Sequence, residues 1–151
     1  MKLKTLIGSG DRIALLTAPV LAVGLAANIL RPSLFSVGGP PAALKVVSAG
    51  FLVVGVTGWL WSVALIVTRV PRGELITTGP YRLVKHPLYT SVALLVLPFG
   101  GLLLDSWLGV PVGLALYVGS RAFSPAEERA LASSFGAAWD AYRRGVKVAW
   151  L

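Results

Sequence analysis

The sequence predicts an all-α integral membrane protein with four transmembrane helices and a C-terminal cytoplasmic helix. Three observations predict this fold. Hydrophobic residues make up 56% of the 151 residues and charged residues only 13%, about half of the roughly 25% that is usual in soluble domains. Four stretches without any charge are long enough, or nearly so, to cross a bilayer. The positive charges are concentrated between or outside these stretches.

The four uncharged stretches are the expected membrane spans. A helix of about 17–25 apolar residues crosses a hydrocarbon core, and we expect spans at about residues 13–30, 46–68, 87–104 and 106–120. The last two are slightly short and form a hairpin. We expect Asp105 to lie in the turn of this hairpin, on the outer side of the membrane.

The distribution of basic residues predicts the orientation. All but two of the 14 lysine and arginine residues precede the first span, lie in the loop 69–85 or follow the last span, while Arg31 and Lys45 lie on the other side. The positive-inside rule then places both termini in the cytoplasm, and we expect a bacterial inner (plasma) membrane protein. Because this asymmetry accounts for most of the net charge of +8, we expect no nucleic-acid partner. Four short spans are also compatible with a homodimer.

The amino-acid inventory excludes several kinds of chemistry. The chain has no cysteine, which excludes disulfides, thiolate metal sites and a cysteine nucleophile. His86 is its one histidine, which excludes a multi-histidine metal centre. We therefore expect no metal site.

The segment after the last span carries a helix signal. Ser124-Pro125-Ala126-Glu127 has the pattern of a capping box with proline at the first helical position. Apolar residues follow at helical spacing, and Gly136 interrupts them: Leu131, Phe135, Ala138, Trp139, Tyr142 and Val146. We expect this helix to pack back against the cytoplasmic ends of the third and fourth spans. The alternative is a helix that lies on the membrane surface.

The polar residues that can perform chemistry fall in the loop before the third span and at the start of the tail helix. Each has a structural alternative. His86, Tyr81 and Tyr89 can be membrane-interface residues, and Glu127 can serve the helix cap. Arg82 and Lys85 can be ordinary positive-inside charges. Glu128 has no such role, and an unpaired carboxylate near a membrane is costly.

Taken together, these segments resemble the isoprenylcysteine carboxyl methyltransferase and phospholipid methyltransferase family of integral membrane enzymes. The shared pattern is ordered along the chain, with Lys85 in place of the usual arginine before His-Pro: Leu75, Gly79-Pro80-Tyr81, Lys85-His86-Pro87-Leu88-Tyr89, Glu127-Glu128, Leu131, Phe135-Gly136, Trp139 and Tyr142.

The resemblance implies one membrane methyltransferase domain with an S-adenosylmethionine pocket at the cytoplasmic face, built from residues 73–89 and 121–146. It implies catalytic roles for His86, Glu128 and Arg82. It further implies cofactor contacts from nine positions of the shared pattern and its flanks: Leu75, Gly79, Pro80, Tyr81, His86, Pro87, Tyr89, Glu127 and Glu128.

The expected function is therefore S-adenosylmethionine-dependent methyl transfer to a lipophilic acceptor. The acceptor can be an isoprenylcysteine-like carboxylate, a phospholipid amine or another membrane-soluble molecule. Two alternatives remain open at this point. One is a non-catalytic membrane protein that retains the fold, and the other is a nicotinamide-dependent protein of the sterol-reductase type.

Overall fold

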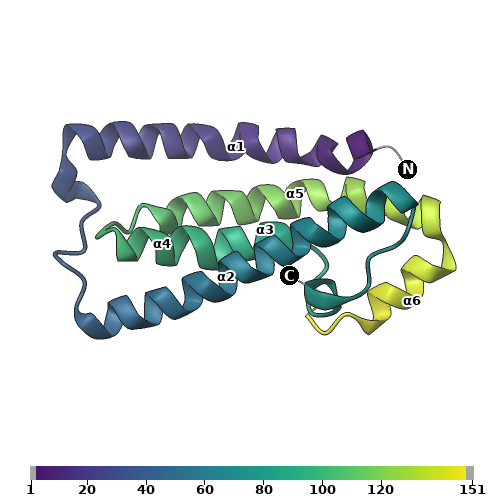
Figure 1. The fold of residues 1–151 in the computed structure, drawn as a ribbon. Helices are drawn as coiled ribbons and strands as arrows, with labels where there is room; N and C mark the ends of the chain where they lie inside the picture. The colour runs from purple at the N-terminus through teal and green to yellow at the C-terminus, as the bar shows by residue number, and fades with distance from the viewer. Residues whose placement is uncertain (1–2, 149–151) are drawn as a thin grey trace.

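The computed structural model describes residues 3–148, with side chains from residue 13 onward, and these residues are predominantly helical (Figure 1). The described part contains no β-strand, only isolated bridges between Ser36 and Ser106 and between Val84 and Val148. The main helices follow one another in this order: α1 (Leu3–Leu30), α2 (Ala42–Arg69), α3 (Pro87–Ser91), the π-helical segment η4 (Val92–Val96), α4 (Leu97–Leu103), α5 (Gly109–Phe135) and α6 (Ala137–Gly145).

The long helices run in alternating directions, with α3, η4 and α4 forming one continuous passage (Figure 1). The start of α1, the end of α2 and α6 lie at one end of the bundle, which we call the α6 end. The α1–α2 and α4–α5 connections lie at the opposite end, which we call the Asp105 end. Arg31 and Lys45 belong to the Asp105 end and the other described basic residues to the α6 end, so the predicted charge asymmetry corresponds to the two ends of the bundle.

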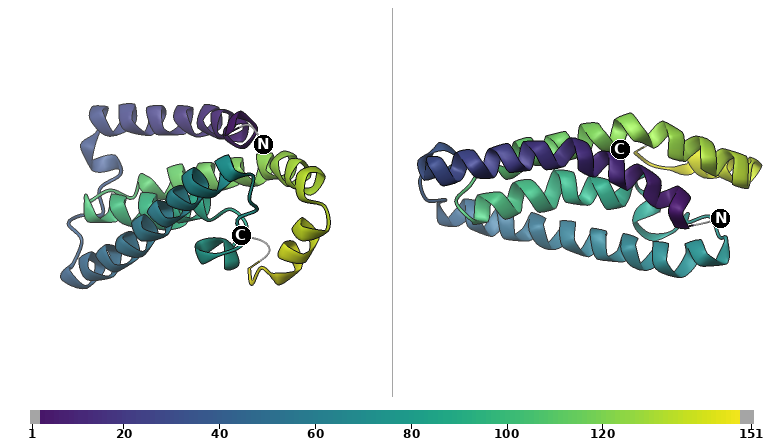
Figure 2. Two further views of the ribbon diagram at one scale, coloured as in Figure 1. Left: turned by 45° about the vertical axis from the view of Figure 1, so that its right-hand side comes forward. Right: turned by 90° about the horizontal axis from the view of Figure 1, so that it is seen from above.

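The α3–α4 passage is the centre of the bundle, between α2 and α5, while α1 packs on α5 (Figure 2). Glycines make the close packing possible. A side chain at Gly109 would collide with the Leu97 carbonyl, and one at Gly113 would collide with the Ala93 carbonyl. The hairpin of α4 and α5 therefore depends on glycine at these positions of α5.

Two of the four expected spans meet the length and hydropathy of a membrane-crossing helix. They lie at Ile13–Leu30 in α1 and Ala42–Arg72 around α2. The third passage, Pro87–Leu103, is a shorter apolar helix. The expected span 106–120 is not a separate helix, because α5 begins at Gly109 and continues to Phe135. Four membrane spans are thus not established by helix length alone.

The predicted start of a tail helix at Ser124 is wrong. Ser124 and Pro125 lie inside α5, and the Ser124 hydroxyl donates to the Ser120 carbonyl instead of capping a new helix. The helix breaks twelve residues after Ser124, at Gly136, where φ is +50° and ψ is −124°. The predicted interruption at Gly136 is therefore confirmed, and it separates α5 from the short helix α6.

At the Asp105 end, Asp105 and Trp107 join the two connections. Asp105 adopts a left-handed conformation with φ 58° and accepts hydrogen bonds from the Ser36 hydroxyl and the Gly39 amide, both at 2.8 Å. The Trp107 amide donates to the Phe35 carbonyl at 2.9 Å, and their rings lie 4.9 Å apart. Asp105 is a turn residue, as predicted, and it also ties the α1–α2 loop to the α4–α5 turn.

Candidate active site

A cavity of about 510 Å³ lies at the α6 end of the molecule. The end of α2, the loop that follows it, the start of α3, the second half of α5 and α6 all contribute to its wall. Most of the lining is apolar, and the polar or charged groups among it are Glu74, Tyr81, Lys85, His86, Tyr89, Glu127, Trp139 and Tyr142. Its volume lies within the roughly 300–1,000 Å³ of small-molecule and cofactor sites.

The Gly-Pro-Tyr segment forms the turn η3 (Gly79–Arg82) in the wall of this cavity. Gly79 has a φ of +63°, and a Cβ atom there would lie 2.9 Å from the Trp61 indole of α2. Pro80 begins the turn, and its carbonyl accepts the Leu83 amide at 3.0 Å. Gly79 and Pro80 therefore shape the turn, whereas Tyr81 lines the cavity. Burial, followed by the nearby Glu127 carboxylate, raises the pKa of the Tyr81 phenol.

The His-Pro segment begins the third passage. Pro87 occupies the first helical position of α3 and is fully buried, and the His86 carbonyl accepts the Thr90 amide at 3.1 Å. The His86 side chain is 8% exposed and lines the cavity together with Tyr89. A proline at this position costs no hydrogen bond, because the first amides of a helix have no partner within it.

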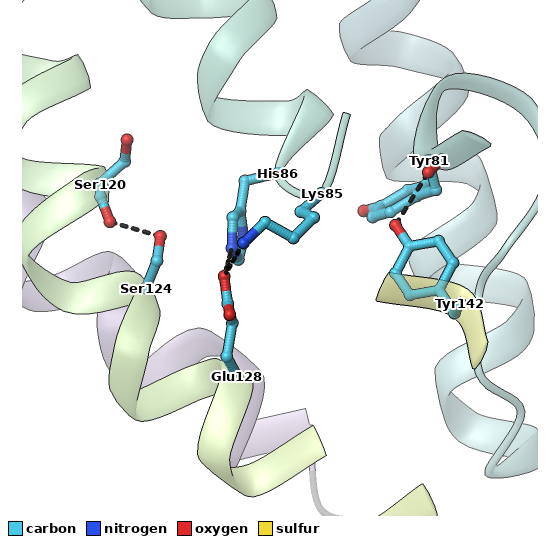
Figure 3. Close-up of polar contacts among 7 residues, drawn as sticks. All are labelled: Tyr81, Lys85, His86, Ser120, Ser124, Glu128 and Tyr142. Atoms are coloured by element: carbon cyan, nitrogen blue, oxygen red, sulfur yellow. Dashed lines mark hydrogen bonds and ion pairs between the residues drawn. The ribbon is translucent and has the colours of Figure 1, made fainter. Parts of the chain in front are cut away.

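Glu128 joins α5 to the His-Pro segment (Figure 3). Its Oε1 atom lies 2.6 Å from Lys85 Nζ and 3.4 Å from His86 Nε2. The hydrogen bond with His86 and the Lys85 ammonium outweigh the effect of burial and lower the pKa of Glu128 from 4.5 to about 2. Glu128 is not itself part of the cavity wall, while Lys85, His86 and the neighbouring Glu127 are.

Helix α6 closes another side of the cavity. Trp139 is 3% exposed, and its ring lies 5.5 Å from that of Tyr142. The Tyr142 hydroxyl donates to the Tyr81 carbonyl at 2.8 Å, as Figure 3 shows. Beyond α6, the Lys147 amide donates to the Arg82 carbonyl at 3.5 Å and the Val148 amide to the Leu83 carbonyl at 2.9 Å. Three consecutive carbonyls of one loop thus hold α6 in place.

The structure brings most of the sequence-predicted site residues together, in different roles. Leu75, Tyr81, His86, Tyr89 and Glu127 line the cavity. Four others lie outside the wall and position the lining residues. Gly79 and Pro80 shape the turn before Tyr81, Pro87 begins the helix after His86, and Glu128 contacts His86. Four residues of the expected apolar stripe also belong to the cavity wall: Leu131, Phe135, Trp139 and Tyr142. Of the other two, Ala138 is exposed and Val146 lies outside the wall.

Arg82 differs from the other predicted residues. It is exposed to solvent and is not part of the cavity wall. Conversely, Lys85, Glu74 and Trp61 contribute to the site or its support without having been predicted to do so. The position of Lys85, directly before His86, could have indicated that it belongs to the site. By contrast, nothing in the sequence of α2 indicates that Trp61 packs on Gly79.

The model of the isoprenylcysteine carboxyl methyltransferase family matches residues 44–133, more than half of the chain. This chain belongs to that family. The matched residues include the Gly-Pro-Tyr turn, the Lys-His-Pro segment and both glutamates, whereas α6 lies beyond the match. No curated protein and no solved structure matches the chain.

Membership of the isoprenylcysteine carboxyl methyltransferase family places the chain among membrane methyltransferases. The two long apolar helices agree with a protein of the membrane. The cavity is therefore the candidate methyltransferase site, because the matched motif residues surround it.

Proposed function

We propose that the protein transfers a methyl group from S-adenosylmethionine to a lipophilic acceptor at the cytoplasmic face of the membrane. The observation that carries this proposal is the cavity itself. It combines a largely apolar wall with a few charged groups, and the residues of the family motif surround it. An unrelated structural protein has no need for these residues to converge.

The residues of the cavity suit S-adenosylmethionine chemically. The cofactor carries a flat adenine, a ribose diol, a carboxylate, an ammonium and a sulfonium. The wall offers aromatic surfaces at Phe135, Trp139 and Tyr142, a carboxylate at Glu127 and an ammonium at Lys85. The aromatic rings can stack with adenine, Glu127 can bind the ammonium or the diol, and Lys85 can bind the carboxylate. When bound, the cofactor supplies an electrophilic methyl group on sulfur.

The chain supplies positioning and exclusion of water. A tyrosine ring, at Tyr81 or Tyr89, favours a sulfonium in front of it by roughly 0.5–2 kcal/mol. Leu131, Phe135 and Trp139 keep water from the reacting atoms. Such positioning can supply a large part of the rate of a displacement at carbon.

His86 is the candidate general base. A carboxylate acceptor needs no base, but an amine acceptor loses a proton during methyl transfer, and His86 lines the cavity. Glu128 holds the imidazole from behind through Nε2. We therefore assign Glu128 the role of a positioning residue, rather than one that contacts the cofactor.

The membrane arrangement that fits this function has four passages. The α3–α4 passage and the first half of α5 complete the bundle begun by α1 and α2, and small residues allow them to pack closely. The concentration of basic residues at the α6 end supports a cytoplasmic location for that end and for the cavity. A lipophilic acceptor then reaches the cavity from the bilayer and the cofactor from the cytosol.

Calorimetry tests the proposal. Detergent-purified wild-type protein is titrated with S-adenosylmethionine beside Glu127→Gln and Lys85→Met, which remove the two charges assigned to the cofactor, with Asp105→Asn at the opposite end as control. We expect wild type and the control to bind alike, and both site variants to bind at least tenfold more weakly, about 1.4 kcal/mol. Folded protein that binds no S-adenosylmethionine in detergent or in lipid contradicts the proposal. Binding of a nicotinamide cofactor instead supports the reductase alternative.

A further inference from the structure

The last described part of the chain folds back toward the membrane. From Arg121 to Phe135, α5 carries the chain about 21 Å along its axis, at a rise of about 1.5 Å per residue. At Gly136 the chain reverses, and α6 runs back (Figure 1). Val148 then pairs with Val84, two residues before His86, where the apolar third passage begins. The C-terminal end of α6 therefore lies near the boundary of the apolar passage.

The two sides of α6 differ in chemistry. Its aromatic residues, Trp139 and Tyr142, line the cavity. Three basic residues near its end, Arg143, Arg144 and Lys147, are exposed. The apolar side is thus already covered by the protein. The outer side is predominantly basic, with Asp140 as the one exposed acidic residue of α6.

Arg82 completes this basic group. The Lys147 amide bonds to the Arg82 carbonyl, so the two residues are adjacent although 65 residues separate them in the chain. Arg82 is also exposed. We call Arg82, Arg143, Arg144 and Lys147 the basic corner. Within residues 13–148, none of these four side chains forms an ion pair.

We propose that the basic corner binds the headgroups of anionic phospholipids in the leaflet that faces it. The position of the corner at the end of the apolar passage favours this partner. Its charge favours it as well, because the four basic side chains outnumber Asp140, the one acidic residue of α6. A polybasic surface next to a membrane is attracted to anionic lipids through the surface potential, within about one Debye length. Because the aromatic side of α6 is turned into the protein, this attachment is electrostatic and needs no insertion of the helix into the bilayer.

This attachment has a consequence for the cavity. The same loop and the same segment that carry the corner also hold the cavity wall, through Tyr142 to Tyr81 and Val148 to Leu83. Anionic headgroups that contact Arg82 and the basic residues of the α6 segment at the same time favour close contact between α6 and the loop that carries Arg82. The lipid composition of the membrane therefore sets how firmly this wall is closed, whatever the cavity binds.

Because the chain has no cysteine, a single introduced cysteine can be labelled specifically to test this proposal. Ala141→Cys, at an exposed position of α6, gives a single attachment site for a nitroxide spin label. The labelled protein is placed in nanodiscs of phosphatidylcholine alone, and in nanodiscs that contain phosphatidylglycerol. We expect the label to become at least about twofold less mobile with phosphatidylglycerol, and salt to reverse the change. Equal mobility in both nanodiscs overturns the proposal.

Two paired variants separate the corner from general positive charge. Arg143→Gln/Arg144→Gln removes two charges of the corner, and Arg121→Gln/Arg129→Gln removes two exposed charges from α5. We expect the first pair to abolish the response and the second to retain it. An equal loss in both pairs overturns the assignment to the corner. Inorganic phosphate is also added to phosphatidylcholine nanodiscs, to test whether the corner binds a free anion. If phosphate alone immobilises the label, the proposal of a lipid site is contradicted.

Discussion

Lys85 Nζ lies 2.6 Å from Glu128 Oε1, and this contact joins two parts of the chain that are 43 residues apart. The two side chains are only 11% and 20% exposed. The contact fixes the start of the third passage against α5 on one side of the cavity. It also explains how a carboxylate is accommodated next to an apolar bundle, since an unpaired charge there is costly.

Loss of the lysine is therefore expected to destabilise the fold. Lys85→Met leaves the partly buried Glu128 carboxylate without its closest partner, which costs about 1–3 kcal/mol. Lys85→Arg keeps the charge and is expected to cost less. Unfolding in detergent, followed by circular dichroism, measures both. Equal stability of Lys85→Met and wild type would show that the contact contributes nothing.

Glu128 also predicts a pH dependence of stability. Its pKa is lowered from 4.5 to about 2 in the folded protein, so its stabilising contribution is fully present above pH 4.5 and is lost as the pH falls toward 2. Glu128→Gln removes this contribution. We expect the difference in melting temperature between wild type and Glu128→Gln to shrink across that range. A constant difference would contradict the assignment of the shift to Glu128, whatever other carboxylates do.

The contact between Gly79 and Trp61 is tested by a pair of alanine variants. Gly79 and Gly73 both have positive φ, at +63° and +70°, but a Cβ atom meets Trp61 only at Gly79. Gly73→Ala measures the backbone cost alone, about 1–2 kcal/mol. We expect Gly79→Ala to cost more, and most of the excess to disappear when Trp61→Ala is added, since Leu65 is then the remaining close neighbour. If Gly73→Ala and Gly79→Ala lower the free energy of unfolding equally, Trp61 does not constrain the turn.

The Asp105 end is expected to affect stability without affecting the cavity. Asp105→Ala removes the acceptor of the Ser36 and Gly39 hydrogen bonds and also places alanine at a positive φ. Asp105→Asn tolerates the backbone conformation better and retains one acceptor. We expect the melting temperature to decrease in the order wild type, Asp105→Asn, Asp105→Ala. Weaker ligand binding in folded Asp105→Asn would contradict the independence of the two ends.

The sequence predicts the helical class, the two longest apolar helices and the Asp105 turn, because these depend on local composition and charge. It does not predict where the tail helix begins. Ser124-Pro125 has the local pattern of a helix start, yet the Ser124 hydroxyl bonds to the Ser120 carbonyl and α5 continues through the proline. The packing of α5 against its neighbours outweighs the local preference.

For the site, the sequence predicts which segments come together but not the direction of each side chain. Spacing along the chain identifies the segments that surround the cavity, and five of the predicted residues line it. The direction of each side chain depends on the local turn and could not be predicted. In the tight turn η3, the side chain of Tyr81 faces the cavity while that of Arg82 is exposed. Glu128 likewise contacts Lys85 and His86, which only the folded chain brings to it.

The pairing of α1 with α5 has a consequence for biosynthesis. The principal packing partner of the first helix is the last long one, and the third passage lies between α2 and α5. A chain emerging from the ribosome therefore delivers α1 and α2 to the bilayer long before the surface that α1 packs on exists. We expect a nascent protein truncated before Gly109 to hold α1 only through its connection to α2, so that the order of synthesis delays the closure of the bundle until α5 has entered.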